Sequence, residues 1–553
     1  MNKICSKCQQ EFNVYPQDKD FYKSIDVPEP EMCPQCRFQL INSYRNERTL
    51  YNRKCDSCKA DIISMYSSDK PYAVYCHSCF WSDKWNPLDY AQDFDFNKSF
   101  FEQFKELRNK VPRLNLLNDD TSENSTYTNH VYHLKNCYIL SDACYNENCL
   151  YGNGIYNSTE CVDCSYVTNK SELCYETTFS EQCYNVKYCD DCHTCRDSAF
   201  LIDCRGCSDC FMCVGLRNKK YCIKNKEYSE QEYCKFVETL HVASLQKINQ
   251  YKKEFNDFAL TVPRKYFHGN KNENSTGDYI LNNKSVHHCY HMRSSEQCAY
   301  CFGMDKSKNC YDVMVYGEDA EQVYQAQATG GQVYKILFGN AIWHGQENYY
   351  CDNCLNGAEY CFGSISLKKH KYCILNKQYS QGEFMKLREK IINYMKETGE
   401  WGNYFPQNIS LFAYNESDAQ GFFPLSKEKA LSQGFSWQDN MPGTYSQETL
   451  TDIPDNINDI DISITKEIIK CENCQKNFKY TESEIKFYEQ QNIPLPNNCP
   501  DCRYRDRLKL RPAFKLYNRK CMNPGCNNKF ETTYSPNRKE IIYCEECYQK
   551  EIY

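Results

Sequence analysis

Eight cysteines near the start of the chain recur at almost the same spacing near its end. The first set is Cys5, Cys8, Cys33, Cys36, Cys55, Cys58, Cys76 and Cys79, and the second is Cys471, Cys474, Cys499, Cys502, Cys521, Cys526, Cys544 and Cys547. The gaps between successive pairs have the same lengths in both sets, as from Cys8 to Cys33 and from Cys474 to Cys499. Two thiolates from each of two tight turns can complete a tetrahedral sulfur cage. The pattern therefore predicts sixteen zinc ligands and four structural Zn²⁺ sites.

We expect consecutive pairs to share an ion, so that the quartet ending at Cys36 forms one site and the quartet ending at Cys79 the next, with the same order at the other end. A cross-braced order, in which alternate pairs share an ion as in a RING finger, is the alternative. The helical sequence after Cys36 and Cys502 resembles a treble-clef finger, and the second site of each module resembles a zinc ribbon. All-sulfur, four-coordinate sites leave no open position for water, so they would stabilise the modules without catalysing a reaction.

The helix expected after Cys502 is the candidate nucleic-acid surface. Its cations lie between positions 503 and 520, a stretch with a single acid, Asp506, and include Arg503, Arg505, Arg507, Lys509 and Arg511. About six to eight phosphate contacts would dominate affinity and make it fall steeply with salt. A solvated basic face that offsets the nearby thiolate charge explains the same pattern. The equivalent N-terminal stretch is weaker because Glu47 interrupts it.

A central run of Cys204, Cys207, Cys210 and Cys213 raises the question of an iron–sulfur cluster. Bacterial ferredoxins use C-x2-C-x2-C-x3-C followed by Pro, whereas here the last spacer is shorter and Val214 follows. Buried repeat positions explain the run without a cluster. A fifth zinc site on Cys189, Cys192, Cys204 and Cys207 is a further alternative.

The sequence offers little support for catalysis. His287, His288 and His291 cluster, but we expect them at the surface, with a surface metal site as the alternative. No Gly-rich phosphate loop, nucleophile elbow or HExxH motif occurs, and the cysteines lack a repeated His partner. We therefore predict that the protein is not an enzyme.

Composition narrows the class of protein. The chain has 553 residues, too many for one core, with 40 Cys, 47 Tyr, only 21 Gly and a net charge of −7. That charge excludes a uniformly basic nucleic-acid binder, and no stretch approaches the roughly 20 apolar residues of a membrane span. The first residues carry no apolar signal segment, and C-x2-C pairs in a reducing compartment are more often metal sites than disulfides. We expect a cytoplasmic protein.

The centre of the chain is also duplicated. Val111-Pro112-Arg113 is matched by Val262-Pro263-Arg264, and Tyr221-Cys222 by Tyr372-Cys373. Because the distance along the chain from the first Val to the closing Cys is the same in both copies, the architecture of the two copies should be the same. We predict two like domains in tandem.

A shorter repeat lies inside each copy. Cysteines followed or preceded by Tyr, Asn or Glu recur at short, nearly regular intervals, as at Cys137, Cys149, Cys161, Cys174 and Cys183, and Val replaces Cys at Val323 and Val333. The repeated position therefore requires a small buried residue and not a ligand. Two repeats of about 9 to 12 residues would make one coil of about 18 to 24, as in parallel β-solenoids. We expect about four coils per domain, with Cys and Val inside and, because neighbours on a strand alternate, a Tyr-rich outer face. Aperiodic Cys-rich loops are the alternative.

Helices should close the solenoids. Ser229-x-x-Glu232 and Ser380-x-x-Glu383 each predict a capping box that opens a helix, running to about 259 and 397, with Leu240, Val242, Leu245 and Ile248 as the apolar stripe of the first. Residues 97–110 predict a matching helix before the first solenoid. Residues 398–470 contain no Cys and many aromatics, and we expect an irregular connector with a short helix near 426–433 stopped by Gly434.

Several motifs resemble an uncharacterised zinc-ribbon family of small-genome candidate-phylum bacteria. They are Cys33-Pro34-Gln35-Cys36-Arg37, the run Leu50-Tyr51-Asn52-Arg53-Lys54-Cys55, residues 74–85 and 100–104, Lys135-Asn136-Cys137-Tyr138, residues 423–428 and residues 543–548. The resemblance spans nearly the whole chain. It implies metal-binding ends around a Cys-rich repeat centre, and it leaves the function of the protein open.

The sequence thus predicts a mainly β chain with capping helices, in which two tandem parallel β-solenoids are flanked by treble-clef or zinc-ribbon modules. The predicted parts are a double-zinc module at 1–96, a solenoid with a leading helix at 97–227, a linking helix and second solenoid at 228–376, a closing helix and connector at 377–470, and a second double-zinc module at 471–553. We expect about four Zn²⁺ per chain and a non-enzymatic scaffold that binds protein partners along Tyr-rich faces. Nucleic-acid binding through the zinc modules and a Cys-based redox or iron–sulfur protein are the alternatives. No membrane partner is expected, and the pattern does not specify an oligomeric state.

Overall fold

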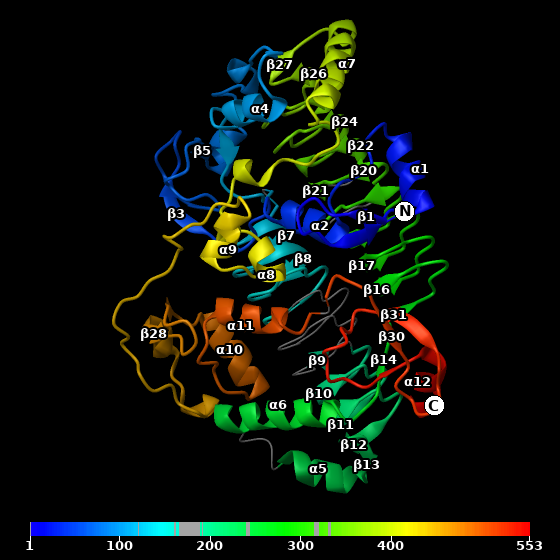
Figure 1. The fold of residues 1–553 in the computed structure, drawn as a ribbon. Helices are drawn as coiled ribbons and strands as arrows, with labels where there is room; N and C mark the ends of the chain where they lie inside the picture. Colours follow the sequence, from blue (N-terminus) through cyan, green and yellow to red (C-terminus); the bar gives the residue numbers. More distant parts are fainter. Residues whose placement is uncertain are drawn as a thin grey trace.

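Two β-solenoids form the body of the molecule, and they lie side by side (Figure 1). The computed structural model describes residues 2–119, 121–159, 162–164, 189–190, 192–238, 244–314, 320–329, 333–511 and 513–552. Both solenoids are built from parallel strands in which each residue pairs with the residue one coil later. The predicted β-solenoid class is therefore confirmed.

The first solenoid contains β7 (Asn129–Lys135), β8 (Ser141–Glu147), β9 (Cys189–Asp190), β10 (Ala199–Ile202), β11 (Ser208–Val214), β12 (Lys220–Ile223) and β13 (Lys226–Glu227). The second contains β15 (Gly269–Asn270), β16 (Gly277–Leu281), β17 (Cys289–Arg293), β18 (Phe302–Asp305), β19 (Cys310–Tyr311), β20 (Val323–Tyr324), β21 (Gln327–Thr329), β22 (Val333–Leu337), β23 (Asn340–Ile342), β24 (Gly345–Tyr349), β25 (Glu359–Phe362), β26 (Lys371–Ile374) and β27 (Lys377–Gln378). Each ends in the same way, because β13 and β27 fold back antiparallel on the strand before them.

A coil is only as long as one sequence repeat. Residue i pairs with residue i+12 of the next coil in Asn129↔Ser141 and Gly277↔Cys289, and the coil is one residue longer where Gln346 pairs with Glu359. The predicted coil, which combined two sequence repeats, is therefore wrong. Every third residue has a positive φ, for example Asn136 and Asp142, so the chain turns a corner after each three-residue side. Asn and Asp tolerate this left-handed region better than most residues and occupy many of the corners, but Ile139 and Tyr145 show that other residues occupy corners too.

This geometry also corrects the predicted alternation of inward and outward residues. Side chains point into the solenoid at every third position, as in the buried series Leu134, Cys137, Leu140 and Ala143. The repeats at Cys161, Cys174 and Cys183 lie outside the described residues. Interior thiols donate to carbonyls of their own coil and the next: Cys204 Sγ lies 3.5 Å from the Ile202 oxygen and 3.6 Å from the Cys213 oxygen. Cysteine suits this position because it is small, apolar and a weak donor.

The two solenoids run in opposite directions along the molecule (Figure 1). Arg113, just before the first solenoid, forms a buried ion pair with Asp352 in a late coil of the second, with 2.6 Å between Nη2 and Oδ2. Leu117 and His130 of the first solenoid line one small cavity together with Gln327 and Ala341 of the second. The beginning of one solenoid therefore lies beside the later coils of the other.

The N-terminal module packs across both solenoids (Figure 1). It contains β1 (Asn2–Ile4), β2 (Glu11–Asn13), α1 (Pro16–Ser24), α2 (Pro34–Asn42), β3 (Tyr51–Lys54), β4 (Asp61–Ser64), β5 (Val74–Tyr75) and α3 (His77–Phe80). The C-terminal module repeats this order with β28 (Ile469–Lys470), β29 (Asn477–Phe478), α10 (Glu482–Gln491), α11 (Pro500–Leu508), β30 (Tyr517–Lys520), β31 (Lys529–Thr532), β32 (Ile542–Tyr543) and α12 (Glu545–Ile552). Each module pairs one strand with the start of a solenoid: β5 with β6 (Arg113–Leu114), and β32 with β14 (Arg264–Lys265).

Helices cover the closed ends of the solenoids. The predicted helix before Val111 is α4 (Phe100–Arg108), and the predicted helix after Ser380 is α7 (Gln381–Glu397), which has the expected capping box with Glu383. The single helix predicted from Ser229 to about 259 is instead two, α5 (Glu230–Glu238) and α6 (Leu245–Ala259), because Ser244 caps a new start. Leu240 and Val242 lie outside the described residues.

The connector between the second solenoid and the C-terminal module is irregular, as predicted. It contains two short helices, α8 (Ala419–Phe422) and α9 (Lys427–Ser432), and the chain leaves α9 through Gly434 with a φ of +81°. Its buried aromatics pack on other parts: Trp401 lies against Phe338 of the second solenoid, and Phe405 stacks on Phe104 of α4. The connector thus joins the N-terminal module, α4 and the second solenoid into one core.

Replacement of an interior thiol tests this account of the solenoid. Cys301 Sγ donates to two carbonyls, 3.3 and 3.4 Å away, and the next residue in its column is Val313. Cys301→Val should lower the free energy of unfolding by about 1 kcal/mol or less, because it keeps the apolar volume and loses only weak hydrogen bonds. Cys301→Asp should lower it by about 3 kcal/mol or more, because an unpaired carboxyl group would be buried. Urea unfolding measures both, and equal effects would contradict an interior position for Cys301.

Candidate metal centres

The structure brings the sixteen predicted zinc ligands together as four quartets. They are Cys5, Cys8, Cys33 and Cys36; Cys55, Cys58, Cys76 and Cys79; Cys471, Cys474, Cys499 and Cys502; and Cys521, Cys526, Cys544 and Cys547. In each quartet the four Sγ atoms all lie within 4.8 Å of one another. Consecutive pairs therefore share a site, and the cross-braced order is not the one adopted.

The same local structure builds each quartet. The first pair sits in the tight turn after one strand, where the Cys5 amide donates to the Gln10 carbonyl at 2.9 Å and Gln9 has a φ of 60°. Lys59 and Gln475 are the corresponding left-handed residues in the second and third turns, whereas in the longer fourth turn the left-handed residue is Gly525, just before Cys526. The second pair lies at a helix N-terminus, since Cys33 precedes α2 and Cys36 falls in its first turn. Unpaired amides and the helix dipole favour thiolates at that end.

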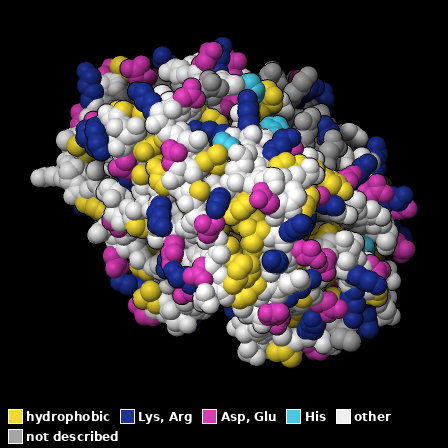
Figure 2. Space-filling view, turned by 90° about the horizontal axis from the view of Figure 1, so that it is seen from above, with side chains coloured by type: hydrophobic (Ala, Val, Ile, Leu, Met, Phe, Trp, Pro, Cys, Tyr) yellow, Lys and Arg dark blue, Asp and Glu magenta, His cyan; other side chains and the backbone are white. Residues whose placement is uncertain are grey.

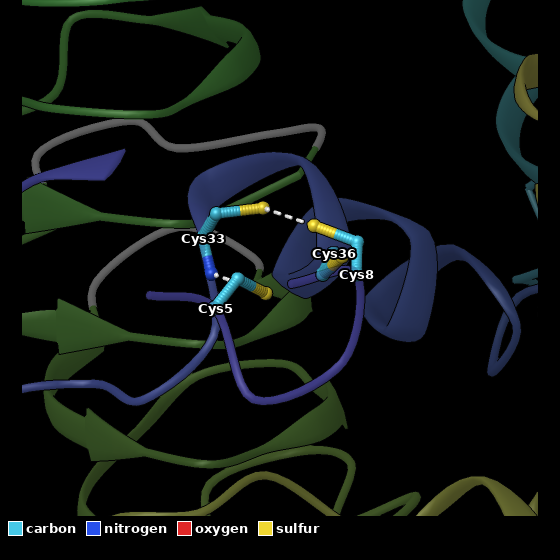
Figure 3. Close-up of side chains that lie close together, drawn as sticks. All are labelled: Cys5, Cys8, Cys33 and Cys36. Carbon is cyan, nitrogen blue, oxygen red and sulfur yellow. Dashed lines mark hydrogen bonds between the residues drawn. The ribbon is translucent and has the colours of Figure 1, made fainter. Parts of the chain in front are cut away.

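Distances within the quartets fit a tetrahedral metal–sulfur centre. With metal–sulfur bonds of about 2.3 Å, the sulfur atoms of a tetrahedron are about 3.8 Å apart. Cys8 and Cys33 have Sγ atoms 3.8 Å apart, as do Cys58 and Cys76, and Cys474 and Cys499 are 3.6 Å apart. The side chains of the first quartet converge on one point (Figure 3). The chain can thus hold about four metal ions, one per quartet.

A backbone hydrogen bond to sulfur recurs in all four sites. The amide of the third cysteine donates to the Sγ of the first at 3.2 Å, in the pairs Cys33–Cys5, Cys76–Cys55, Cys499–Cys471 and Cys544–Cys521. Such bonds neutralise part of the thiolate charge and fix the ligand orientation. The third site adds a side chain, because Arg505 Nη2 lies 3.0 Å from Cys502 Sγ.

The residue after the last cysteine of each quartet reaches a solenoid. Arg37, after Cys36, forms a buried bidentate pair with Asp312 at 2.8 and 2.9 Å. Arg503, after Cys502, lies 3.2 Å from Asp163 Oδ2 of the first solenoid. All four of these residues, namely Arg37, Phe80, Arg503 and Tyr548, are buried. These contacts join residues far apart in the sequence and were not predicted. The arginine that directly follows both Cys36 and Cys502 was a usable signal.

The second quartet of each module makes the corresponding contact. Phe80, after Cys79, lies under the ammonium group of Lys368 in the second solenoid, 4.5 Å from its Nζ. Tyr548, after Cys547, hydrogen-bonds Asp203 of the first solenoid. Through these four residues the N-terminal module docks on the second solenoid and the C-terminal module on the first. Each module also contacts the other solenoid, as in Arg45 with Asp142 and Thr533 with Asp278.

Much of the predicted nucleic-acid surface is buried. Arg503 and Arg507 are 7% and 5% exposed, and both lie against Asp163. Arg511 packs over the Phe422 ring, which leaves Arg505 and Lys509 as the exposed members of the predicted set. Lys509 pairs with Asp506 at 2.6 Å. On the face seen from above, Lys and Arg side chains lie among Asp and Glu side chains (Figure 2).

The central cysteines have a different environment. Within the described part of the chain, the four terminal quartets are the only groups of three or more His, Cys, Asp or Glu with ligand atoms within 4.8 Å of one another. Cys204, Cys207, Cys210 and Cys213 occupy successive inward positions of the first solenoid, and each donates to a carbonyl. The side chain of Cys189, a member of the alternative fifth zinc site, lies outside the described residues. His287 and His288 have lowered pKa values because both are partly buried.

Burial keeps several thiols inside the second solenoid protonated, whereas hydrogen bonds from neighbouring thiols lower the pKa of Cys207 and Cys213 in the first. Burial raises the pKa well above the ordinary thiol value at Cys301, Cys310, Cys351 and Cys361. A thiol with a raised pKa is a poor nucleophile and a poor metal ligand, because both roles require the thiolate. These positions of the second solenoid favour packing over redox chemistry.

Comparison with known proteins finds no matching protein-family model, no matching curated protein and no matching solved structure. Among the described helices, none has both the length and the apolar character needed to cross a membrane.

Metal content distinguishes the two kinds of cysteine. Purified protein should contain about four Zn²⁺ per chain and no iron, measured by inductively coupled plasma mass spectrometry. Cys36→Ser should lower this by one ion and reduce the melting temperature. The matched control Cys298→Ser should retain four ions, because a hydroxyl can replace the Sγ that donates to the Glu296 and Ser307 carbonyls. Metal loss in the control, or full metal in Cys36→Ser, would contradict the assignment.

Proposed function

We propose that this protein is a non-enzymatic, zinc-dependent structural protein, in which metal-centred modules fasten two β-solenoids into one scaffold. The observation that carries the proposal is the buried residue that follows the last thiolate of each quartet and contacts a solenoid. A metal that fixes the helix N-terminus would also fix the direction of that residue. Treble-clef and zinc-ribbon architecture, with zinc as the metal, belongs to the same proposal.

The contacts of the two modules correspond residue by residue, which supports a structural role. Arg37 lies over the Tyr300 ring, whose hydroxyl donates to Asp18 in the first turn of α1 at 2.8 Å. Arg503 lies over the Tyr151 ring, whose hydroxyl donates to Glu484 in the first turn of α10 at 2.5 Å. A contact that recurs with the same chemistry in both modules is expected of residues that hold the modules on the solenoids.

The Tyr-rich outer face predicted to bind partners is largely covered by the chain itself. Along the second solenoid, Tyr311, Tyr324 and Tyr350 are 5%, 0% and 0% exposed beneath the N-terminal module and the connector. Among the described solenoid residues, the exposed Tyr127 and Tyr145 of the first solenoid and Tyr334 of the second are the remaining candidates for a protein partner. Protein partners stay a proposal, with this narrower surface.

The other expectations from the sequence stay predictions. They are membership of the zinc-ribbon family that the motifs resemble, a cytoplasmic location, and the absence of catalysis. Nucleic-acid binding also stays a prediction, and it now depends on fewer exposed cations, chiefly Arg505 and Lys509.

Substitution of the buried arginine tests the docking contact. Arg37→Met should lower the free energy of unfolding by about 3–5 kcal/mol, because Asp312 would remain buried without its partner. The double variant Arg37→Met/Asp312→Leu should recover most of this loss, since an apolar pair of similar volume avoids the desolvation cost. Denaturant unfolding of both variants is the measurement. A single variant as stable as the wild type would show that the pair does not hold the module.

Metal removal tests the coupling between the quartets and the docked state. Treatment with a strong chelator should increase amide hydrogen exchange in residues 296–314, which the N-terminal module covers. Residues 371–378, which lie under α7, serve as the internal control and should change little. Complete loss of metal with unchanged exchange in residues 296–314 would overturn the proposed function.

A further inference from the structure

A loop of each module packs on a helix of the other module, and we call these two contacts junctions. The two junctions differ in chemistry. Each loop precedes the repeated run that begins at Leu50 and Leu516, so Arg48 and Phe514 occupy equivalent positions. Phe514 packs on Phe38 of α2, with ring centroids 5.1 Å apart. Arg48 lies over Tyr504 of α11, 4.2 Å from its ring centroid. Phe38 and Tyr504 are themselves equivalent, each two residues after the last thiolate of its quartet.

One junction is filled and the other is open. The guanidinium of Arg48 lies on Tyr504 and 3.5 Å from the Asp501 carboxylate. At the other junction Gln35 takes the place of Asp501, and Phe514 that of Arg48. There the chain leaves a cavity of about 200 Å³ lined by Phe38 and Phe514 together with residues of β2 and the second solenoid. The cavity opens to solvent, because Gln10, Glu11 and Lys515 at its rim are exposed.

The solenoid wall of the cavity is also more aromatic than its counterpart. Tyr300 and Tyr151 are equivalent, because each donates to the acid in the first turn of a docking helix. Positions in the two solenoids can be matched by counting along the coil from these two tyrosines. His288 of the cavity then corresponds to Ile139 of the first solenoid, Tyr290 to Ser141, and Phe302 to Asn153. The docking of a module therefore does not require aromatic side chains at these places. Their concentration around the open cavity needs another explanation.

We propose that this cavity is a binding site for a single planar, uncharged heteroaromatic ring of the nucleobase type. Its walls present faces and edges of rings in several orientations: Phe302 meets Phe514 edge-on at 4.8 Å, and His288 stacks on Tyr300 at 5.6 Å. Aromatic rings pack on one another in these offset and edge-to-face arrangements. The volume lies below the roughly 300–1,000 Å³ of sites for larger ligands, which suits one ring system.

Polar groups around the cavity favour the binding of a heteroaromatic ring more than that of a hydrocarbon ring. The side-chain amides of Gln10, Asn13 and Gln35 line it and can pair with ring nitrogens and exocyclic groups. The charged lining residues, Glu11 and Lys515, are exposed at the rim and of opposite sign. A charged ring would therefore find no buried carboxylate, ammonium or guanidinium group among the lining residues, although Cys33, a buried member of the first quartet, also lines the cavity. The ring can come from a free nucleoside or from a base of a single strand.

Ligand-detected NMR on the full-length, metal-loaded protein tests the proposal. Adenosine should give saturation-transfer signals from its base protons, whereas cyclohexanol, an apolar ring without π faces, should give none. Phe514→Arg should reduce adenosine binding at least tenfold, because it places in the cavity the side chain found at the filled junction. The matched control Leu510→Arg adds the same charge at an exposed position of the C-terminal module and should leave binding unchanged.

A short single-stranded RNA in a parallel titration distinguishes the two sources of the ring. Tighter binding of RNA than of adenosine, with both lost in Phe514→Arg, would support a site that reads a base within a strand. Equal binding of cyclohexanol, undiminished adenosine binding in Phe514→Arg, or no binding of either aromatic ligand would overturn the proposal. If Phe514→Arg loses metal, Gln35→Trp provides a second way to fill the cavity, and retained binding in that variant would likewise overturn it.

Discussion

The architecture depends on a buried ion pair placed one residue beyond the last cysteine of a quartet. Arg37 and Arg503 are almost fully buried, and a guanidinium in such a place is tolerated only when a carboxylate neutralises it. Asp312 and Asp163 supply that charge from the solenoids. Cys36 and Cys502, which directly precede these arginines, lie in the first turn of a helix. Any interaction that fixes the positions of the four sulfur atoms therefore also fixes the direction of the arginine side chain. The positions of the sulfur atoms and the docking of the module are thus mechanically coupled.

An internal two-fold relationship organises the whole chain. The N-terminal module pairs a strand with the start of the first solenoid and docks on the second, and the C-terminal module does the reverse. The two solenoids run in opposite directions, and the start of the first lies beside later coils of the second (Figure 1). The loop junctions break this symmetry. One encloses Arg48 on Tyr504, whereas its counterpart, with Phe514 on Phe38, remains open.

Cysteine serves two distinct purposes in this molecule, and local backbone geometry separates them. In the modules, pairs from a tight turn and a helix N-terminus bring four sulfurs within 4.8 Å, and backbone amides donate to sulfur. In the solenoids, the thiol itself donates to carbonyls of two coils, as at Cys301. Backbone amides also donate to the solenoid thiols Cys289 and Cys213, so what distinguishes the quartets is the convergence of four sulfur atoms.

Thiol spacing was enough to predict the four quartets, because a C-x2-C turn and a fixed gap are local properties of the chain. Matching ends likewise revealed the duplicated centre, and Ser380-x-x-Glu383 located a helix start. The coil length was not predictable in this way, since it depends on a corner with positive φ at every third position, at residues as varied as Asn136, Ile139 and Tyr145. Nor was the burial of Arg503 and Arg507, because their partner Asp163 lies far away in sequence, in the first solenoid. Contacts over such separations depend on the packing of whole domains, which no local pattern encodes.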